Sequence, residues 1–506
     1  MADVFKTPGV YIKEIPSFPP SIAEVETAIP AFIGYTEQAI YNGKPITEPV
    51  RITSLLEYET LFGRADKETA ITVTITDVTS NNVVTSRTLK ADIDATKQSK
   101  FRMYYSLQMY FANGGGPCYI VSVGNYSNPP EKGDDTKGLQ LGLNKIKSFD
   151  EPTLLVFPDA LGIDAGLQYY PLMKLAMDQC FELQDRFLIM DIPEKDDAGG
   201  PVVGAMKGFR ETDGATPIGN EIDKLKYAAA YFPNLDTILN FRYDESAVKI
   251  KYVRDNTELT VDDGQAGDSE DLRFSHLQAP PNNLNAAIGG ANGLKLPSTE
   301  LYNQVKAELQ KVTVKLPPSS AVAGVYARVD SNRGVWKAPA NESLAFVKAA
   351  TIKISHKDQE AMNVDPTSGK SVNAIRYFTG KGLLIWGSRT LAGNDNEWRY
   401  VPVRRFFNFA EESIKKGSEW VVFEPNDANT WARVKAMIEN FLLKQWRAGA
   451  LAGAKPEHAF FVKVGLGVTM TALDILEGRM NIEIGMAVVR PAEFIILKFS
   501  HKLQES

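Results

Sequence analysis

The spacing of hydrophobic and polar positions predicts a mixed α/β protein of several domains. The periodicity of residues 397–500 predicts, in order, a helix, a short strand, a second helix and then paired strands. The second helix, residues 429–447, has apolar positions at spacings of three and four: Trp431, Val434, Ile438, Phe441, Leu442 and Gln445 or Trp446. We expect Asp427 to cap this helix and Gly449 to end it.

The middle of the chain alternates between short apolar runs and helical periodicity. Apolar runs at 153–157 and 186–192 predict buried strands, with a helix between them at about 166–183. Such alternation predicts an α/β layer with a largely buried sheet. A helix is also expected at 54–63, and two polar inserts are predicted: a hairpin at 71–94 that turns at 80–82, and an acidic surface segment at 243–275.

Two aspartates are the candidate catalytic groups. Asp159 and Asp191 follow the predicted strands, at the sheet edge where α/β enzymes bind ligands. A hydrolase-like site using them is one alternative, but no nucleophile, base or Gly-rich partner accompanies them, so we favour caps or loop anchors. The glycines at 114–116 lie between a helix and a strand, the reverse of a phosphate-binding loop.

Composition excludes several classes of function. The 506 residues are 44% hydrophobic and 23% charged, as in ordinary globular proteins, and the net charge of −6 argues against nucleic-acid or bulk membrane binding. No apolar run is long enough to insert in a membrane, and the start lacks a signal peptide, so we expect cytoplasmic assembly. Cys118 and Cys180 are expected to be buried thiols. The four histidines lack ligand spacing, so neither a metal nor a cofactor is expected.

Both ends of the chain predict extended arms. Prolines recur through residues 3–30 and forbid a helix, and the alternation between them predicts an edge strand made of Val10, Tyr11, Ile12, Lys13, Glu14 and Ile15. A second strand, strongly β-prone, is predicted near the C-terminus: Phe494, Ile495, Ile496, Leu497, Lys498 and Phe499. Left unpaired, such an edge would promote aggregation.

A family resemblance is carried by four segments in a fixed order. The clearest is a long stretch at 317–341 that we interpret as irregular, PPSSAVAGVYARVDSNRGVWKAPAN. The others are TPGVYIKE at 7–14 with 29–34, GLLIWGSRTL at 382–391, and WRYVPVRRFFN at 398–408 continuing through WVVFEPN at 420–426. Together they resemble contractile tail sheath proteins of myophages, R-type pyocins and extracellular phage-tail-like injection systems. The resemblance covers about residues 3–60 and 315–500.

The resemblance implies a structural subunit and not an enzyme. Sheath proteins form stacked hexameric rings around an inner tube, meet a baseplate and a terminal cap, and contract while their arms add strands to neighbouring subunits. A helix of their C-terminal domain touches the tube, which makes four basic residues candidates for tube attachment: Arg433, Lys435, Lys444 and Arg447. Two alternatives to a contractile sheath are an enzyme that uses Asp159 and Asp191 and a static self-assembling shell protein.

The expected domain boundaries follow from these assignments. Residues 1–25 and 491–506 are the linking arms, and residues 26–65 together with 315–490 form the sheath core domain. Residues 66–136 carry the first hairpin insert with its connecting helix and strand, and residues 137–314 form an inserted outer α/β domain.

Overall fold

The computed structural model describes residues 21–81, 83–163, 168–195, 197–210, 218–259, 272–278, 287–288 and 294–497. Contacts divide the chain into two compact units: a core unit, residues 26–408 and 490–506, and a terminal unit, residues 1–25 and 409–489. This division differs from the expected domains, because strands from 26–65, 66–136, 137–314 and 315–490 share one sheet of the core unit. Among the described residues, no helix has the length and apolarity needed to cross a lipid bilayer.

The mixed α/β class is confirmed by a nine-stranded sheet in the core unit. Its six inner strands run parallel in the order β19-β10-β9-β8-β1-β7. Antiparallel β20 and then β17 extend one edge, and antiparallel β4 forms the other. The strands are β1 Pro30–Gly34, β4 Val50–Ile52, β7 Cys118–Ser122, β8 Leu154–Val156, β9 Phe187–Asp191, β10 Ala228–Phe232, β17 Glu342–Ser343, β19 Val372–Phe378 and β20 Gly382–Trp386. The runs at 153–157 and 186–192 are therefore strands, as predicted.

Helices cover both faces of this sheet. Along β1, Phe32 joins the core on one face, whereas Ala31 and Ile33 join the core on the other. The first core takes in α1 Leu55–Phe62, α2 Met103–Ala112 and α8 Ser319–Arg333. The second takes in α3 Gly138–Ile146, α4 Tyr170–Leu183, α5 Pro201–Arg210, α6 Ile222–Leu225 and α9 His356–Asn363. Ser54 caps α1 and Gly63 ends it, so that prediction is confirmed.

Helix α8 corrects the interpretation of residues 317–341 as irregular. Nine of its fifteen residues are buried, and they are mostly small: Ser319, Ser320, Ala321, Val322, Ala323, Gly324, Val325, Tyr326 and Val329. A Cβ at Gly324 would lie 2.4 Å from the carbonyl oxygen of Tyr110, so α8 packs directly on the backbone of α2. A helix buried on most of its surface lacks the apolar stripe by which a sequence reveals a helix.

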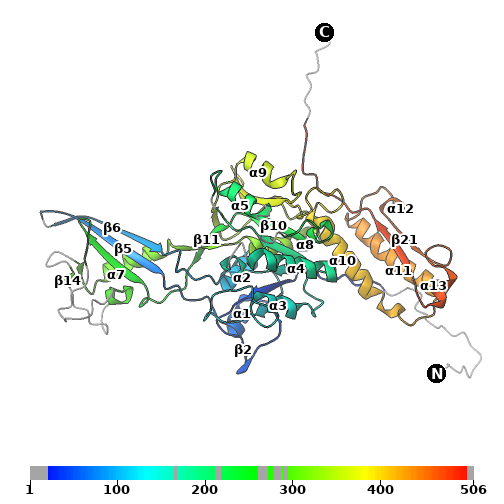
Figure 1. Cartoon of the computed structure of the whole chain (residues 1–506), viewed down its shortest axis with the longest axis horizontal. Helices are drawn as coiled ribbons and strands as arrows, with labels where there is room; N and C mark the ends of the chain where they lie inside the picture. Colours follow the sequence, from blue (N-terminus) through cyan, green and yellow to red (C-terminus); the bar gives the residue numbers. More distant parts are fainter. Residues whose placement is uncertain are drawn as a thin grey trace, which may run out of the picture. The chain divides into compact units, whose positions relative to one another are not determined.

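The two inserts meet in one sheet of the core unit. The predicted hairpin is confirmed as β5 Ile71–Ser80 and β6 Val83–Ile93, and β12 Lys249–Arg254 and β13 Thr257–Leu259 extend it in the order β13-β12-β5-β6. Helix α7 Thr299–Leu309 packs on β5 and β6 (Figure 1). Of the acidic segment, residues 260–271 lie outside the described residues. Smaller sheets pair β11 Leu235–Asn240 with β16 Thr313–Leu316 and β18 Val347–Ala350, β2 Ile40–Tyr41 with β3 Lys44–Pro45, and β14 Ala287–Ile288 with β15 Leu294–Lys295.

The terminal unit contains two long helices and a hairpin. Helix α10 Val401–Gly417 enters it at residue 409, and α11 Ala428–Arg447 is the predicted second helix. The Asp427 side chain accepts a hydrogen bond from Thr430 N, which confirms the cap. The rest is α12 Pro456–Ala459, β21 Phe460–Val464, α13 Ala472–Leu476 and β22 Ile482–Met486.

The prediction of a short strand between the two long helices is wrong. A 3-10 turn, η4 Glu419–Val421, stands there, followed by exposed Val422 and Phe423. Phe423 has a φ of +70°, in the left-handed region, which ends any extended run. No strand of the described part of the terminal unit pairs with this segment, so its apolar side chains gain nothing from an extended backbone.

Candidate inter-subunit sites

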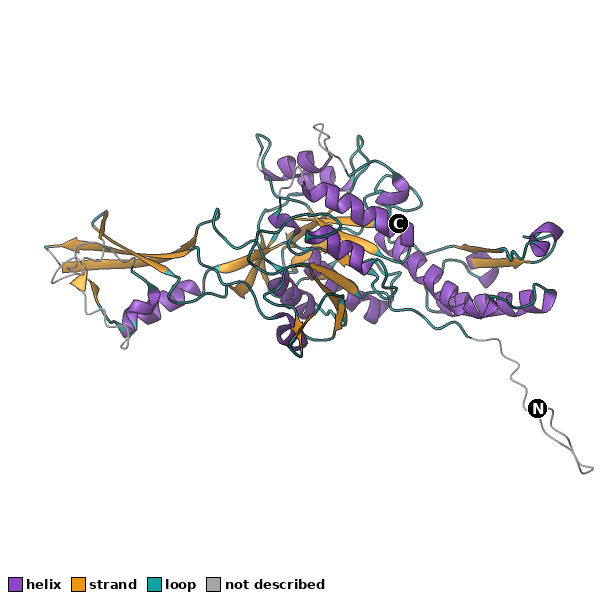
Figure 2. Cartoon of the chain, turned by 60° about the horizontal axis from the view of Figure 1, so that its bottom comes forward, coloured by secondary structure: helices purple, strands orange, loops and turns teal. Residues whose placement is uncertain are grey.

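The hairpin of the terminal unit is a two-stranded sheet in the described chain. Strands β21 and β22 pair antiparallel, with Phe460 opposite Met486, Val462 opposite Ile484, and Val464 opposite Ile482. Figure 2 shows the hairpin beside the long helix α11, on which β21 packs. Each strand uses one edge for this pair, so the outer edge of each carries backbone groups without a strand partner among the described residues.

The face of the hairpin that carries Val462 is only partly covered. Val462 is buried, whereas its apolar neighbours on the same face, Phe460, Val464, Ile482, Ile484 and Met486, are half-buried. On the opposite face the Phe461 ring lies over Gly485, where a Cβ would come within 2.2 Å of it. A sheet of two strands is too narrow to bury its apolar face, so it is suited to receive further strands.

The basic residues of α11 are exposed, but three of the four already have partners within the chain. The Arg433 guanidinium stacks 4.5 Å from the Trp420 ring centroid, and Lys435 Nζ lies 3.8 Å from Glu439 Oε1. Lys444 Nζ lies 2.7 Å from Glu24 Oε1. Arg447 is exposed and has no ion pair within the part of the chain that the structure describes.

The segment that follows the predicted N-terminal arm is attached to the terminal unit, and we call it the N-terminal root: Ile22, Glu24 and Val25. Glu24 Oε1 accepts hydrogen bonds from Lys444 and, at 2.9 Å, from Gln445 on α11. Ile22 is buried against Gly417, where a Cβ would lie 2.7 Å from Ile22 Cγ1. Val25 N donates to Ser413 Oγ over 3.2 Å.

Beyond this root the chain enters the core unit at a buried ion pair. Arg405 Nη2 donates to the Thr27 carbonyl oxygen over 2.8 Å, and its Nη1 lies 3.0 Å from Asp330 Oδ1. Thr27 Oγ1 donates to Asp330 Oδ2 over 2.7 Å. Both charged side chains are nearly fully buried, which fixes the backbone at the entrance to β1.

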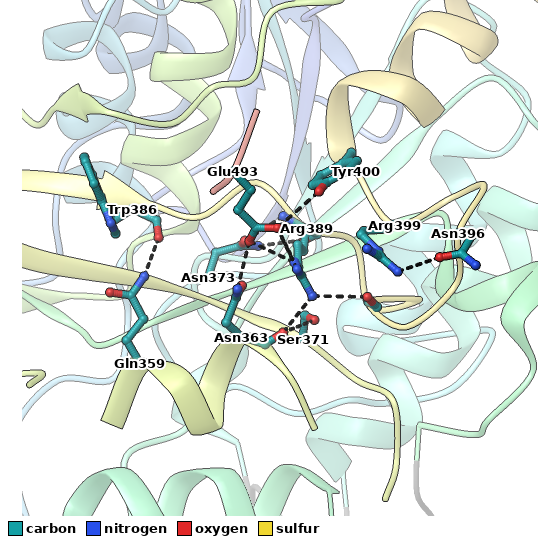
Figure 3. A network of polar contacts seen from close by, with 11 residues as sticks. Gln359, Asn363, Ser371, Asn373, Trp386, Arg389, Asn396, Arg399, Tyr400 and Glu493 are labelled. Atoms are coloured by element: carbon teal, nitrogen blue, oxygen red, sulfur yellow. Dashed lines mark hydrogen bonds and ion pairs between the residues drawn. The ribbon is translucent and has the colours of Figure 1, made fainter. Parts of the chain in front are cut away.

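The C-terminal arm starts from a polar cluster of the core unit, shown in Figure 3, which we call the Glu493 clamp: Glu493, Arg389, Asn363 and Tyr400. Arg389 binds the Glu493 carboxylate through Nε at 3.0 Å and Nη2 at 2.6 Å. Asn363 Nδ2 donates over 2.8 Å and the Tyr400 hydroxyl over 3.1 Å. Burial raises the pKa of Glu493, but the hydrogen bonds from Arg389 and Asn363 outweigh it and leave the pKa below its ordinary value.

The predicted C-terminal arm strand directly follows Glu493, and the predicted N-terminal arm strand precedes the N-terminal root in the sequence. Phe494, Ile495, Ile496 and Leu497 have no secondary structure in this chain, and their side chains are 72 to 80% exposed. The rest of the predicted strand residues lie outside the described residues: Lys498, Phe499, and Val10, Tyr11, Ile12, Lys13, Glu14 and Ile15. Strand formation by either arm stays a prediction.

Asp159 and Asp191 hold the starts of helices, the role that we favoured from the sequence. Asp159 is buried and accepts hydrogen bonds from the backbone N–H groups of Tyr35, Arg102 and Met103, the last two at the start of α2. Asp191 accepts from Ser319 N at 2.7 Å and Ser319 Oγ at 2.6 Å, at the start of α8. Burial raises the pKa of Asp159 to about 6 and that of Asp191 to about 7.

These carboxylates are committed to the fold. Both are fully buried, and the oxygens of each accept hydrogen bonds from neighbouring backbone or hydroxyl groups. Within the described ranges, no three His, Cys, Asp or Glu side chains gather as metal ligands do. Cys118 and Cys180 are free and buried, and burial raises the pKa of each thiol well above its ordinary value.

The sequence reasoning missed both roots. Glu24 and Glu493 were not singled out, although each is an acidic residue within a predicted arm. Arg389 lies inside the 382–391 segment that carries the resemblance, and that segment could have drawn attention to it. The partner positions could not be found locally, because 421 residues separate Glu24 from Gln445 and 104 separate Arg389 from Glu493.

Comparisons with known proteins match the chain to sheath proteins over its whole length. The chain is 30% identical to the helical sheath of the anti-feeding prophage (AFP) in its contracted state, over 99% of this chain and 100% of that one, with a TM-score of 0.59. It is 28% identical to the sheath of an extracellular contractile injection system, PVC, in the contracted state, over 99% of both chains, with a TM-score of 0.61.

Phage proteins match over shorter segments. A model of the phage tail sheath C-terminal domain matches residues 393–502. The tail sheath protein of Burkholderia phage BcepMu is 29% identical over 142 residues, 28% of this chain and 30% of that protein. The tail sheath protein of Enterobacteria phage T4 is 24% identical over 160 residues, 32% of this chain and 23% of that protein. The matched segments thus span less than a third of these two phage proteins.

Proposed function

The chain belongs to the contractile tail sheath family, and from this premise we propose that it polymerises as stacked hexameric rings around an inner tube and contracts to drive that tube through a target envelope. The whole-length match to a sheath in its contracted state, at 30% identity, carries the proposal. By this proposal the protein is a mechanical subunit and not an enzyme, and Asp159 and Asp191 are fold residues.

Strand exchange between subunits is the linkage that we propose. The outer edges of β21 and β22 receive strands from neighbouring copies: one from Val10–Ile15 and one from Phe494–Phe499. The half-buried apolar face of the hairpin supports this, because added strands would extend the layer over α11 and bury Ile482, Ile484 and Met486 further. The apolar side chains of Phe494 to Leu497, exposed in the single chain, would become buried in the same step.

Attachment to the inner tube is proposed for the exposed basic face of α11. Arg433, Lys435, Lys444 and Arg447 would meet acidic groups of the tube in contacts that salt weakens. The contacts inside the chain rank them: Arg447 is exposed and has no ion pair with a described residue, whereas Lys444 also holds the N-terminal root. Arg447 is therefore the member whose charge is most available to a partner.

Contraction needs a source of free energy, and we propose that assembly supplies it. Subunits assembled in an extended form would hold fewer contacts than subunits in the contracted form, so the change is a rearrangement between two sets of interfaces. The rigid units would rotate and slide while the arm linkages stay paired. A baseplate would trigger the change at one end, and a cap would close the other. We propose assembly in the cytoplasm as part of a phage-tail-like particle.

Removing the N-terminal arm tests the linkage. A chain without residues 1–20 should fold as a monomer, judged by circular dichroism and size-exclusion chromatography, but should form no sheaths with the tube protein under the electron microscope. Normal sheaths from this chain would contradict strand exchange. Full-length sheaths of two diameters, extended and contracted, would separate a contractile sheath from a static shell.

Charge reversal tests attachment. Arg433→Glu, Lys435→Glu and Arg447→Glu together should weaken binding to the tube more than self-assembly of the sheath, because Lys444 and the N-terminal root are left intact. Lys90→Glu, at an exposed position of β6 in the insert sheet, is a single-charge control outside the α11 face and the hairpin. Equal losses of tube binding and self-assembly in the triple variant would count against the assignment.

A further inference from the structure

We propose that Glu493 is a positioning residue that fixes where the C-terminal arm leaves the core unit, so that the apolar strand beyond it is held for a second copy of this chain. The inference rests on the proposed strand exchange. It identifies the residue that keeps the donated strand available to a neighbour.

The carboxylate of Glu493 is held from three directions. Arg389 follows β20, Asn363 ends α9 and Tyr400 directly precedes α10, and each donates a hydrogen bond to the carboxylate. Arg389 binds both oxygens in a bidentate geometry, which fixes direction as well as distance (Figure 3). A carboxylate held by three elements cannot turn without breaking a charged hydrogen bond.

Arg389 is itself fixed. Its side chain is 4% exposed, and its Nη1 also donates to the carbonyl oxygens of Asn363 and Gly393. Its backbone N–H and C=O are both hydrogen-bonded to the buried side chain of Asn373, on β19, at 2.7 and 2.8 Å. Glu493 is therefore attached to β19 of the nine-stranded sheet through a single intervening residue, Arg389.

The clamp forms a sharp boundary in the chain. The Glu493 side chain is 21% exposed, and the very next residue, Phe494, is 72% exposed. The chain is thus fixed up to Glu493, and every residue from Phe494 to Leu497 presents an apolar side chain to solvent. A boundary one residue wide separates the attached part of the chain from the part proposed to pair with a neighbour.

The clamp also opposes a competing pairing within the same chain. Residues 487–489 are hydrogen-bonded to the backbone of Ala450, Ala452 and Ala459, so residues 490–493 join this paired segment to the arm, and a loop of that length can close a hairpin. A free linker would present the arm to the subunit's own hairpin at an effective concentration of about 1 mM, which would compete with pairing to a second copy. Fixing Glu493 removes the freedom that self-pairing needs.

Spin labels on the unassembled subunit test the boundary. Labels are attached to Phe494→Cys or to Leu497→Cys; Cys118 and Cys180 are buried and leave the new thiol as the reactive one. The label at 494 should rotate more slowly than the label at 497, and Glu493→Gln should remove that difference. Equal mobility at the two positions before the substitution would overturn the proposal.

Assembly tests the function of the clamp. Glu493→Gln leaves the buried Arg389 charge without its carboxylate, and we expect the rate of sheath formation to fall about tenfold, as expected from loss of a charged hydrogen-bonded pair. Tyr400→Phe removes one hydrogen bond and should give a fall of about threefold. It serves as the second variant if Glu493→Gln does not fold. Glu182→Gln, the same change at an exposed residue of α4 that pairs with Lys147, should assemble normally.

A chain without residues 494–506 separates this inference from the proposed function. If this truncation stops assembly while Glu493→Gln and Tyr400→Phe assemble at the normal rate, the positioning role of Glu493 is overturned and strand exchange stands. If the truncated chain assembles normally, strand exchange fails and the clamp has no arm to position. Slow assembly of Glu493→Gln, with normal assembly of Glu182→Gln and no assembly by the truncated chain, supports both.

Discussion

The two arms are attached to the subunit by opposite kinds of contact. Lys444 and Glu24 at the N-terminal root have side chains 71% and 41% exposed, whereas Arg389 and Glu493 in the clamp are 4% and 21% exposed. The N-terminal root belongs to the terminal unit and the clamp to the core unit. An exposed ion pair contributes about 0 to 1 kcal/mol, whereas breaking a buried one costs about 3 to 5 kcal/mol.

This difference teaches that equivalent linkages need not be equally rigid. Ile22, packed against Gly417, is the firmest contact of the N-terminal root, and the next fixed point is the buried Arg405–Asp330 pair at Thr27. The C-terminal arm has its buried ion pair at the last residue before the exposed strand. Breaking the exposed ion pair at the N-terminal root should therefore cost less free energy than breaking the buried one in the clamp.

The largest effect is expected from Arg389→Ala. The substitution leaves the Glu493 carboxylate partly buried and without a charge partner, so we expect a loss of about 2 to 4 kcal/mol in the free energy of unfolding. Urea denaturation of the unassembled subunit measures it. A loss no larger than that of Lys444→Ala would remove the contrast between the two roots.

Acid should weaken the clamp by less, because a protonated Glu493 keeps some of its hydrogen bonds. The pKa of Glu493 is lowered in the folded chain, so its contribution is complete above the unfolded pKa of about 4.3 and is lost as pH falls through the lower, folded pKa. The stability difference between the unmodified chain and Glu493→Gln should be constant from pH 8 to 5 and shrink below pH 4.

Measuring a difference is necessary, because the core unit has its own pH dependence. The pKa values of Asp159 and Asp191, about 6 and 7, are raised, so the folded chain binds protons that the unfolded chain has released. These two groups make the fold more stable as pH falls from about 7 to 4, the opposite sign to Glu493. If the stability difference between the unmodified chain and Glu493→Gln grew in acid, this would contradict an ionised Glu493 in the clamp.

Gly417→Ala should weaken the N-terminal root by about 1 to 2 kcal/mol. The added Cβ would lie 2.7 Å from Ile22 Cγ1, so Ile22 must leave its site. Gly208→Ala in α5 is the matched control: its Cβ would have 3.6 Å to its nearest neighbour, and the change should stabilise the fold by about 0.5 to 1 kcal/mol. Thermal denaturation measures whether each substitution stabilises or destabilises the fold. Stabilisation by Gly417→Ala would show that Ile22 does not hold the root.

The smallest effect is expected from Lys444→Ala. Its ion pair with Glu24 is exposed, so its removal should change the free energy of unfolding by less than about 0.5 kcal/mol, and 1 M salt should abolish the difference. Arg389→Ala should keep most of its effect in the same salt, because buried pairs are screened less. If Lys444→Ala kept its effect on the free energy of unfolding in 1 M salt, the ion pairs of the two roots would not differ in their screening by salt.

The parts of the fold that the sequence predicted are those with a local signal. Helix α11 has one buried face and a capping Asp427, and β8 and β9 are short apolar runs, so their periodicity was sufficient. Helix α8 was missed because burial on most of its surface removes the polar face. The candidate C-terminal arm strand could be named from residues 494–499 alone, because an unpaired run of β-prone apolar residues promotes aggregation, and its pairing stays a prediction.

The contacts that hold the arms could not be predicted in this way. Glu493 is an ordinary acidic residue in the sequence, and its importance depends on Arg389, Asn363 and Tyr400, which the fold brings from three other elements. Likewise, Lys444 belongs to the basic face of α11 by periodicity, and only the structure pairs it with Glu24. A local pattern records which face of an element is polar but not which distant residue it meets.

The position of Glu493 between β22 and the arm has a mechanical consequence. A pull on residues beyond 493 reaches the clamp before it reaches β22, because the clamp comes first along the chain from the arm. The pull is then carried by the nine-stranded sheet and not by the small hairpin, whose two strands would otherwise unzip from one end. By this inference Glu493 protects the hairpin mechanically: a pull on the C-terminal strand would load the clamp and leave in place the hairpin at which other strands would join.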